Sequence, residues 1–158
     1  PMMARRIVPW VVLVLLIGAG AAWYLGTRPE PLSDEQQVLR LIADVQRAVE
    51  QKRTSDLMRY VSEDYQDSRG LDRRGVQRLV MAGARDRSTM DLSVQVTSIE
   101  VQGDGATFTA EVNYSVGGTA MPGASDHLTV RGELRRERGG WRVVGAEGWQ
   151  DAERSYFD

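Results

Sequence analysis

The sequence predicts an α+β fold, in which a transmembrane helix precedes three helices and four antiparallel strands. Residues 7–25 carry no charge, apolar residues recur at three- and four-residue steps from residue 34 to residue 53, and from residue 91 apolar and polar residues alternate. With 158 residues, 42% hydrophobic and 27% charged, the chain has the composition of one globular domain.

Composition also excludes several classes of function. Lys and Arg number 20 against 22 Asp and Glu, so nothing in the net charge of −2 favours a nucleic-acid partner. Cysteine is absent, which excludes disulfides, thiolate metal sites and a cysteine nucleophile. The single histidine lies in no cluster with metal-ligand spacing, and we therefore predict neither a metal nor a cofactor.

Residues 7–25 (IVPWVVLVLLIGAGAAWYL) predict a transmembrane helix roughly 28 Å long. Trp10 and Trp23 lie near its two ends, where aromatic rings favour the membrane interfaces. Arg5 and Arg6 precede the run, and positive residues stay on the cytoplasmic side. We expect residues 1–6 in the cytoplasm of a bacterium and the rest of the chain, beyond the inner membrane, in the periplasm.

A cleaved secretory signal is the alternative, because Ala19, Gly20 and Ala21 have the small-residue pattern of a cleavage site. Cleavage after Ala21 would release a secreted soluble domain. The apolar run is longer than a usual signal sequence, which favours the retained anchor. Gly18 and Ala22 are four residues apart and would let a partner helix approach closely within the bilayer.

Residues 26–32 contain Pro29 and Pro31 and predict a short stiff linker to a domain at residues 33–150. Ser33 and Gln36 form a capping-box pattern, so we expect a long amphipathic helix at about residues 34–53. Without the three arginines of residues 1–28, the formal net charge falls from −2 to −5, which disfavours attraction to an anionic membrane surface.

Two shorter helices follow in the expected order. Residues 55–61 suit a second helix, and Asp72 can cap a third helix that presents Val76, Leu79 and Val80 on one face.

The strands are predicted from alternation and from turn residues. Asp104-Gly105 is expected to form a two-residue hairpin turn that places Val101 opposite Phe108. The inward residues change parity between Val96 and Ile99, which predicts a β-bulge at residues 97–98.

The second half of the sheet is expected to follow a Gly-containing loop at residues 117–124. Residues 128–134 alternate, and Gly139-Gly140 would turn the chain into a last strand with Trp141 and Val143 inward. Gly132 and Gly145 then either permit a sharp bend in the sheet or leave room for a ligand.

Residues 56–65 (DLMRYVSEDY), residues 70–73 (GLDR) and the closing residues 141–143 (WRV) resemble the nuclear transport factor 2-like superfamily, in its SnoaL-like bacterial branch. The resemblance covers about residues 34–150. It implies a cone in which a strongly curved sheet wraps a long helix. The superfamily includes ketosteroid isomerases, polyketide cyclases and dehydratases, but also members without catalysis. A membrane anchor before such a domain looks like the inner-membrane scaffold subunits of type IV secretion systems.

Four residues are candidates for chemistry on such a fold: Tyr65, Asp67, Tyr114 and His127. Proton transfer needs a perturbed group within hydrogen-bond reach of a substrate, and a tyrosine beside a buried aspartate could polarise a carbonyl. The structural alternative is that the tyrosines fill the core, that Asp67 turns the chain, and that His127, which opens a strand and lacks a local carboxylate partner, lies at the surface. We therefore assign no catalytic residue.

Two features are candidates for partner binding. The tail at residues 151–158 carries Tyr156 and Phe157, whose rings have no evident intramolecular role. Arginines cluster about the third helix, where they would either dock an acidic surface or form a solvated face. A homodimer through the sheet stays open, although the alternate face of the sheet is polar.

These features predict a single-span, periplasm-facing accessory or interaction module, a small subunit of a larger inner-membrane complex. The alternative function is small-ligand binding or SnoaL-like catalysis of the isomerase, cyclase or dehydratase type in the cavity of the cone.

Overall fold

The computed structural model describes residues 31–85, 89–118 and 121–149. The chain divides after Leu32 into two units, and the described elements belong to the second. Three helices come first: α2 (Asp34–Glu50), α3 (Thr54–Met58) and α4 (Arg73–Arg85). The strands β1 (Thr89–Gln102), β2 (Gly105–Gly118), β3 (Met121–Glu137) and β4 (Gly140–Glu147) follow.

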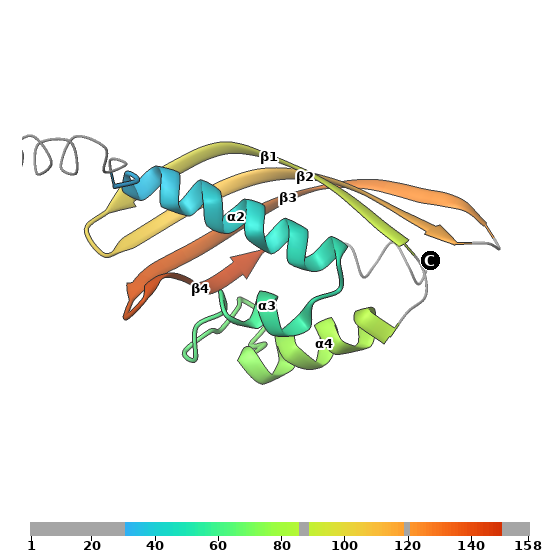
Figure 1. Cartoon of the computed structure of the whole chain (residues 1–158), viewed down its shortest axis with the longest axis horizontal. Helices are drawn as coiled ribbons and strands as arrows, with labels where there is room; N and C mark the ends of the chain where they lie inside the picture. The colour runs from blue at the N-terminus through green and yellow to red at the C-terminus, as the bar shows by residue number, and fades with distance from the viewer. Residues whose placement is uncertain (1–30, 86–88, 119–120, 150–158) are drawn as a thin grey trace, which may run out of the picture. The chain divides into compact units, whose positions relative to one another are not determined.

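The four strands form one antiparallel sheet in the order β1-β2-β3-β4. Figure 1 shows the sheet curving over α2, with α3 and α4 following below that helix. This arrangement confirms the predicted α+β class and the order of helices before strands.

The predicted anchor at residues 7–25, with Gly18 and Ala22, lies outside the described residues, and so does the tail with Tyr156 and Phe157. Within the described ranges, no helix has the length and apolar character needed to cross a membrane.

Helix α2 begins as predicted and ends earlier. The Ser33 hydroxyl accepts a hydrogen bond from the Gln36 backbone at 3.2 Å, and the Gln36 side chain accepts one from the Ser33 backbone at 3.0 Å. The helix ends at Glu50 because Lys52 adopts a φ of 54° and the Arg53 N–H donates back to the Ala48 carbonyl at 2.8 Å. This Schellman motif usually uses glycine, and a lysine there gives no sequence signal.

Helix α3 is shorter than the predicted segment at residues 55–61. Val61 leaves the helix and forms a parallel bridge with Val143 of β4. The Ser62 N–H donates to the Val143 carbonyl at 2.9 Å. Pairing with the sheet therefore replaces the last helical turn.

Helix α4 is capped by Asp72 as predicted, since its carboxylate accepts a hydrogen bond from the Gly75 N–H at 2.7 Å. Val76 and Val80 pack against α3, as expected. Leu79 is 39% exposed. In the described part of the chain α4 lies against α3 alone, so only a narrow stripe of it is covered.

The first hairpin turns at Gly103-Asp104, and not at the predicted Asp104-Gly105. Gly103 has a φ of 59°, which fits a type II′ turn with glycine at its first central position. Val101 therefore pairs with Ala106 and not with Phe108. The register differs from the predicted one by two residues, and a shift of two leaves every side chain on its expected face. The predicted bulge is confirmed between Val96 and Ser98.

Three predictions about the second half of the sheet were wrong. Much of the predicted loop at residues 117–124 is strand, because β2 reaches Gly118 and β3 begins at Met121. No sequence signal indicated this, since backbone pairing between strands does not require alternating apolar residues. His127 consequently lies within β3, opposite Asn113, and does not open the strand. The second turn uses residues 138–139, and Gly140 already pairs with Glu137 in β4.

The core lies between α2 and the sheet. Its buried members come from four elements and are Val38, Leu41, Ile42, Ala106, Leu134 and Trp141. A second cluster of Ala48, Leu57 and Met58 joins α2 to α3.

Gly132 and Gly145 both lie close to atoms of neighbouring segments. A Cβ on Gly132 would lie 2.2 Å from the Phe108 ring, which covers that glycine on the neighbouring strand. A Cβ on Gly145 would lie 3.2 Å from the Gln66 carbonyl oxygen, because the segment after α3 runs beside β4. Both glycines thus allow a close approach that a larger residue would prevent.

Candidate functional site

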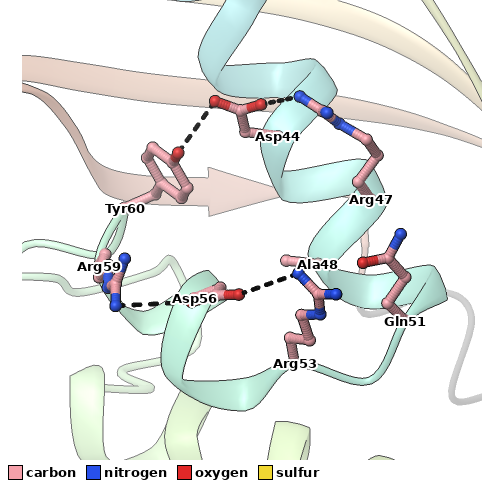
Figure 2. Close-up of a pocket in the computed structure, with 8 residues that line it drawn as sticks. All are labelled: Asp44, Arg47, Ala48, Gln51, Arg53, Asp56, Arg59 and Tyr60. Carbon is pink, nitrogen blue, oxygen red and sulfur yellow. Dashed lines mark hydrogen bonds and ion pairs between the residues drawn. The ribbon is translucent and has the colours of Figure 1, made fainter.

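A pocket of about 390 Å³ opens between the second half of α2 and α3. Figure 2 shows its lining, which is mostly charged and comes from both helices and the residues that flank α3. The lining residues are Asp44, Arg47, Ala48, Gln51, Arg53, Asp56, Arg59 and Tyr60.

One side of the pocket is a chain of three polar side chains. The Tyr60 hydroxyl donates a hydrogen bond to Asp44 Oδ2 at 3.0 Å, and the other oxygen of Asp44 pairs with Arg47 (Figure 2). Burial, and then the hydrogen bond to the Asp44 carboxylate, raise the pKa of Tyr60 above its usual value. Tyr60 is fixed by the sheet, because its carbonyl accepts a hydrogen bond from the Val143 N–H at 2.7 Å.

The other side is organised about Asp56 in α3. Arg53 approaches Asp56 Oδ2 at 3.7 Å, and Arg59 approaches Asp56 Oδ1 at 3.7 Å. Both distances exceed those of a hydrogen bond, which are about 2.7–3.2 Å between nitrogen and oxygen. The two guanidinium groups thus flank one carboxylate without closing on it (Figure 2).

Exposure separates the charges of the pocket into two layers. The side chains of Asp44 and Asp56 are 25% and 35% exposed, whereas those of Arg47, Arg53 and Arg59 are 64%, 62% and 74% exposed. The carboxylates therefore lie deeper, and the rim that meets the solvent is cationic.

Tyr65 and Asp67, two of the residues proposed from the sequence, are brought together in a buried position. They are 5% and 7% exposed. Burial and the nearby charge of Asp67 raise the pKa of Tyr65 to about 12, against the opposing effect of hydrogen bonds with the Trp149 side chain and the Ala146 backbone. The Tyr65 phenol therefore stays protonated throughout the physiological range.

Asp67 also shapes the loop between α3 and α4. Its Oδ1 accepts hydrogen bonds from the Arg69 N–H at 2.9 Å and from the Leu71 N–H at 2.8 Å. This turn-forming role is the structural alternative considered for Asp67 above.

Tyr114 and His127 lie elsewhere, and both line a pocket of about 500 Å³ along β1, β2 and β3. Tyr114 is buried in β2, as the alternation predicts. His127 is 57% exposed, with Nε2 2.7 Å from Glu111 Oε2 and Nδ1 2.9 Å from Asn113 Oδ1. His127 lies at the surface, as the structural alternative expects, and its carboxylate partner, Glu111, is not local but lies on the neighbouring strand, where sequence spacing gives no indication of it.

Sequence reasoning missed two polar clusters. The pocket between α2 and α3 is one, and its only sequence signal is the three-residue spacing of Asp44 with Arg47 and of Asp56 with Arg53 and Arg59. The other cluster joins the buried Ser62 hydroxyl, which donates to Glu137 at 2.6 Å, with Arg135. Hydrogen bonds from Ser62 and then from Arg135 lower the pKa of Glu137.

Within the residues that the structure describes, no group of three or more His, Cys, Asp or Glu side chains could hold a metal ion. The lining of the α2–α3 pocket offers charge recognition by guanidinium groups, with hydrogen bonding by Gln51 at the rim.

No family model and no curated protein matches the sequence. Solved structures do match. A candidate dehydratase of the nuclear transport factor 2-like family from Streptomyces avermitilis superposes with a TM-score of 0.67 at 18% identity, over 75% of this chain and 97% of that one.

Two other similar structures differ in their described roles. A candidate scytalone dehydratase from Novosphingobium aromaticivorans has a TM-score of 0.63 at 15% identity, over 72% of this chain and 81% of that one. A candidate association domain of calcium/calmodulin-dependent protein kinase type II from Thiobacillus denitrificans has a TM-score of 0.59 at 16% identity, over 77% and 97%. Together with the helices followed by a curved four-stranded sheet, these likenesses show that the chain has the nuclear transport factor 2-like fold.

Proposed function

We propose that this chain is a membrane-tethered accessory protein whose folded domain faces the periplasm and binds a ligand or partner through the α2–α3 pocket. One observation carries the proposal, namely a pocket of about 390 Å³ that is lined by charged side chains from two helices. Its volume lies within the range of about 300–1,000 Å³ that is common for small-molecule sites.

The arrangement of the other candidates favours binding over catalysis. Tyr114 and His127, which is 57% exposed, line a separate pocket along β1, β2 and β3. Tyr65 is 5% exposed and is not among the lining residues of that pocket or of the α2–α3 pocket. Proton-transfer catalysis needs acid and base groups that converge on one substrate. The charged pocket between the helices, by contrast, is open to the solvent and has its donors in place.

The tether is supported by the sequence of residues 7–25, which is uncharged, long enough to span a bilayer and preceded by Arg5 and Arg6. A seven-residue linker at residues 26–32 would keep the domain close to the membrane, in reach of other subunits of an inner-membrane complex.

The absence of cysteine makes a topology test simple. Met3→Cys and Gln95→Cys each introduce a single thiol, the second on an exposed position of β1. In spheroplasts of a Gram-negative host, a membrane-impermeant maleimide should label Gln95→Cys and leave Met3→Cys unlabelled until the membrane is permeabilised. Release of the protein by alkaline carbonate would contradict the tether.

Binding is tested by linkage, because a ligand that binds the native state raises its melting temperature. The full chain should melt at a higher temperature in its native membranes than after detergent extraction and dilution. In an Arg53→Glu/Arg59→Glu variant this difference should disappear while the melting temperature of the extracted protein stays the same. An equal difference in melting temperature for the wild type and the double variant would count against binding at the α2–α3 pocket.

A second candidate function is dehydratase- or isomerase-type catalysis, and the pairing of buried Tyr65 with Asp67 is the observation that favours it. A phenol with a pKa of about 12 is a hydrogen-bond donor at neutral pH and could polarise a carbonyl. Turnover of a β-hydroxy carbonyl compound that Tyr65→Phe abolishes and Arg53→Gln leaves intact would support this function.

A further inference from the structure

We propose that the α2–α3 pocket recognises an oxyanion, the carboxylate or phosphate group of a small molecule, between the guanidinium groups of Arg53 and Arg59. The inference rests on the proposed function and names the ligand class for the same site.

Unused hydrogen-bond donors are the first argument. A guanidinium group carries five N–H donors, and carboxylates and phosphates accept two of them in parallel. Arg53 and Arg59 reach the Asp56 carboxylate only at 3.7 Å, which is too long for a hydrogen bond. The guanidinium groups of Arg53 and Arg59 can therefore form hydrogen bonds with an added oxyanion without first breaking a short ion pair.

The layering of charge is the second argument. Asp56 lies deeper than the two arginines that flank it, with a side chain 35% exposed against 62% for Arg53 and 74% for Arg59. The carboxylate holds two like charges near each other, and one carboxylate against two guanidinium groups leaves a local excess of one positive charge. An incoming anion would meet the guanidinium groups before it met Asp56.

Asp44 plays a different role, because its charge is already engaged. One of its oxygens accepts the Tyr60 hydroxyl and the other pairs with Arg47. This closed pair fixes the far wall of the pocket, and Ala48 and Gln51 complete its lining. A small organic anion would thus place its charged group at Arg53 and Arg59 and its remaining polar atoms near the Gln51 amide.

The test uses the full chain in detergent micelles and isothermal titration calorimetry with two probes, inorganic phosphate and succinate, at constant ionic strength. At least one of the two probes should bind with a dissociation constant of about 10 mM or lower. Preference for phosphate or for succinate identifies the kind of oxyanion. The absence of binding by both probes would overturn the inference.

Paired variants separate the pocket from general electrostatics. Arg53→Gln/Arg59→Gln should weaken binding at least tenfold, about what the loss of charge-assisted hydrogen bonds implies. Arg74→Gln/Arg78→Gln removes the same charge from exposed positions of α4 and should change the affinity less than about twofold. Equal losses in both double variants would overturn the proposal.

A third comparison gives an expected gain. Asp56→Asn removes the carboxylate that competes with the ligand and should tighten binding about threefold or more. Asp104→Asn is the matched control, because Asp104 is exposed and also has an arginine, Arg136, at 3.7 Å. Weaker binding by Asp56→Asn, with its melting temperature unchanged, would contradict the assignment.

The two proposals fail in different ways. If neither probe binds but the membrane-dependent rise in melting temperature persists and needs Arg53 and Arg59, the oxyanion inference is wrong and the binding function stands. If the rise is absent, the proposed function is wrong whatever the probes do.

Discussion

At the scale of single residues, Tyr65 shows how burial controls the charge of a group. Its phenol is 5% exposed, and burial together with the charge of Asp67 raises its pKa to about 12. In the unfolded chain a tyrosine titrates near 10. Folding therefore favours the protonated phenol, and the benefit is complete below about pH 10 and is lost as the pH rises towards 12.

We predict from this shift that the free energy of unfolding falls by about 2–3 kcal/mol between about pH 10 and pH 12 on account of Tyr65 alone. Tyr65→Phe should remove this part of the decline, at a cost of about 1–2 kcal/mol at neutral pH from the lost acceptor of the Ala146 and Trp149 hydrogen bonds. Urea denaturation of both proteins across this range measures the difference. Parallel declines would show that Tyr65 is not responsible.

Gly132 illustrates a residue whose role depends on its neighbour across the sheet. A methyl group there would lie 2.2 Å from Phe108 Cε1, so we predict that Gly132→Ala destabilises the domain by about 1–3 kcal/mol. In a Phe108→Leu background the same substitution should cost less, because the ring that it meets is gone. Chemical denaturation of the wild type, the two single variants and the double variant gives the coupling free energy between the two positions. Additive changes in the free energy of unfolding would contradict the contact between residue 132 and the Phe108 ring.

At the scale of elements, the first hairpin shows the effect of turn chemistry on register. Gly103 has a φ of 59°, a left-handed value that alanine adopts at a cost of about 1–2 kcal/mol. A Cβ on Gly105 would meet only the Gln102 carbonyl, at an ordinary 3.6 Å. The two glycines therefore differ sharply in what they tolerate.

We predict that Gly103→Ala lowers the free energy of unfolding by about 1 kcal/mol, whereas Gly105→Ala leaves it unchanged or raises it slightly. Thermal or urea denaturation of the two single variants is sufficient. The opposite order would place the turn at Asp104-Gly105, as the sequence pattern alone predicts.

Sequence patterns predicted the elements whose signals are local. The cap at Ser33, the cap at Asp72, the inward positions of β2 and the bulge beside Thr97 all follow from periodicity or from side-chain chemistry within a few residues. The end of α2 escaped prediction because a lysine, and not a glycine, adopts the left-handed position at Lys52.

The candidate site was harder to predict, because it depends on contacts between elements. Asp56 with Arg53 and Arg59 has the spacing of ordinary surface ion pairs, and only the packing of α3 beside α2 makes it one wall of a pocket. The partnership of His127 with Glu111 likewise depends on strand register. The proximity of Tyr65 to Asp67 was within reach of sequence reasoning, since only Gln66 separates them.

At the scale of the whole molecule, a fold shared with a candidate dehydratase and with a candidate association domain does not by itself identify a function. The site, and not the fold, indicates the function. The charged pocket between α2 and α3 is open to the solvent and suited to binding, whereas Tyr65 is too buried to serve readily in catalysis. An N-terminal anchor would place such a binding domain beside the membrane, where an accessory subunit acts.

The reactivity of one introduced thiol tests this account most directly. Gln51→Cys places a thiol in the lining of the pocket, and Gln95→Cys provides an exposed reference on β1. In native membranes, relative to purified protein, maleimide should modify Gln51→Cys several times more slowly, while the rate at Gln95→Cys should not change. Equal rates at residue 51 in both preparations would mean that nothing occupies the pocket, and the account of a tethered binding domain would be wrong.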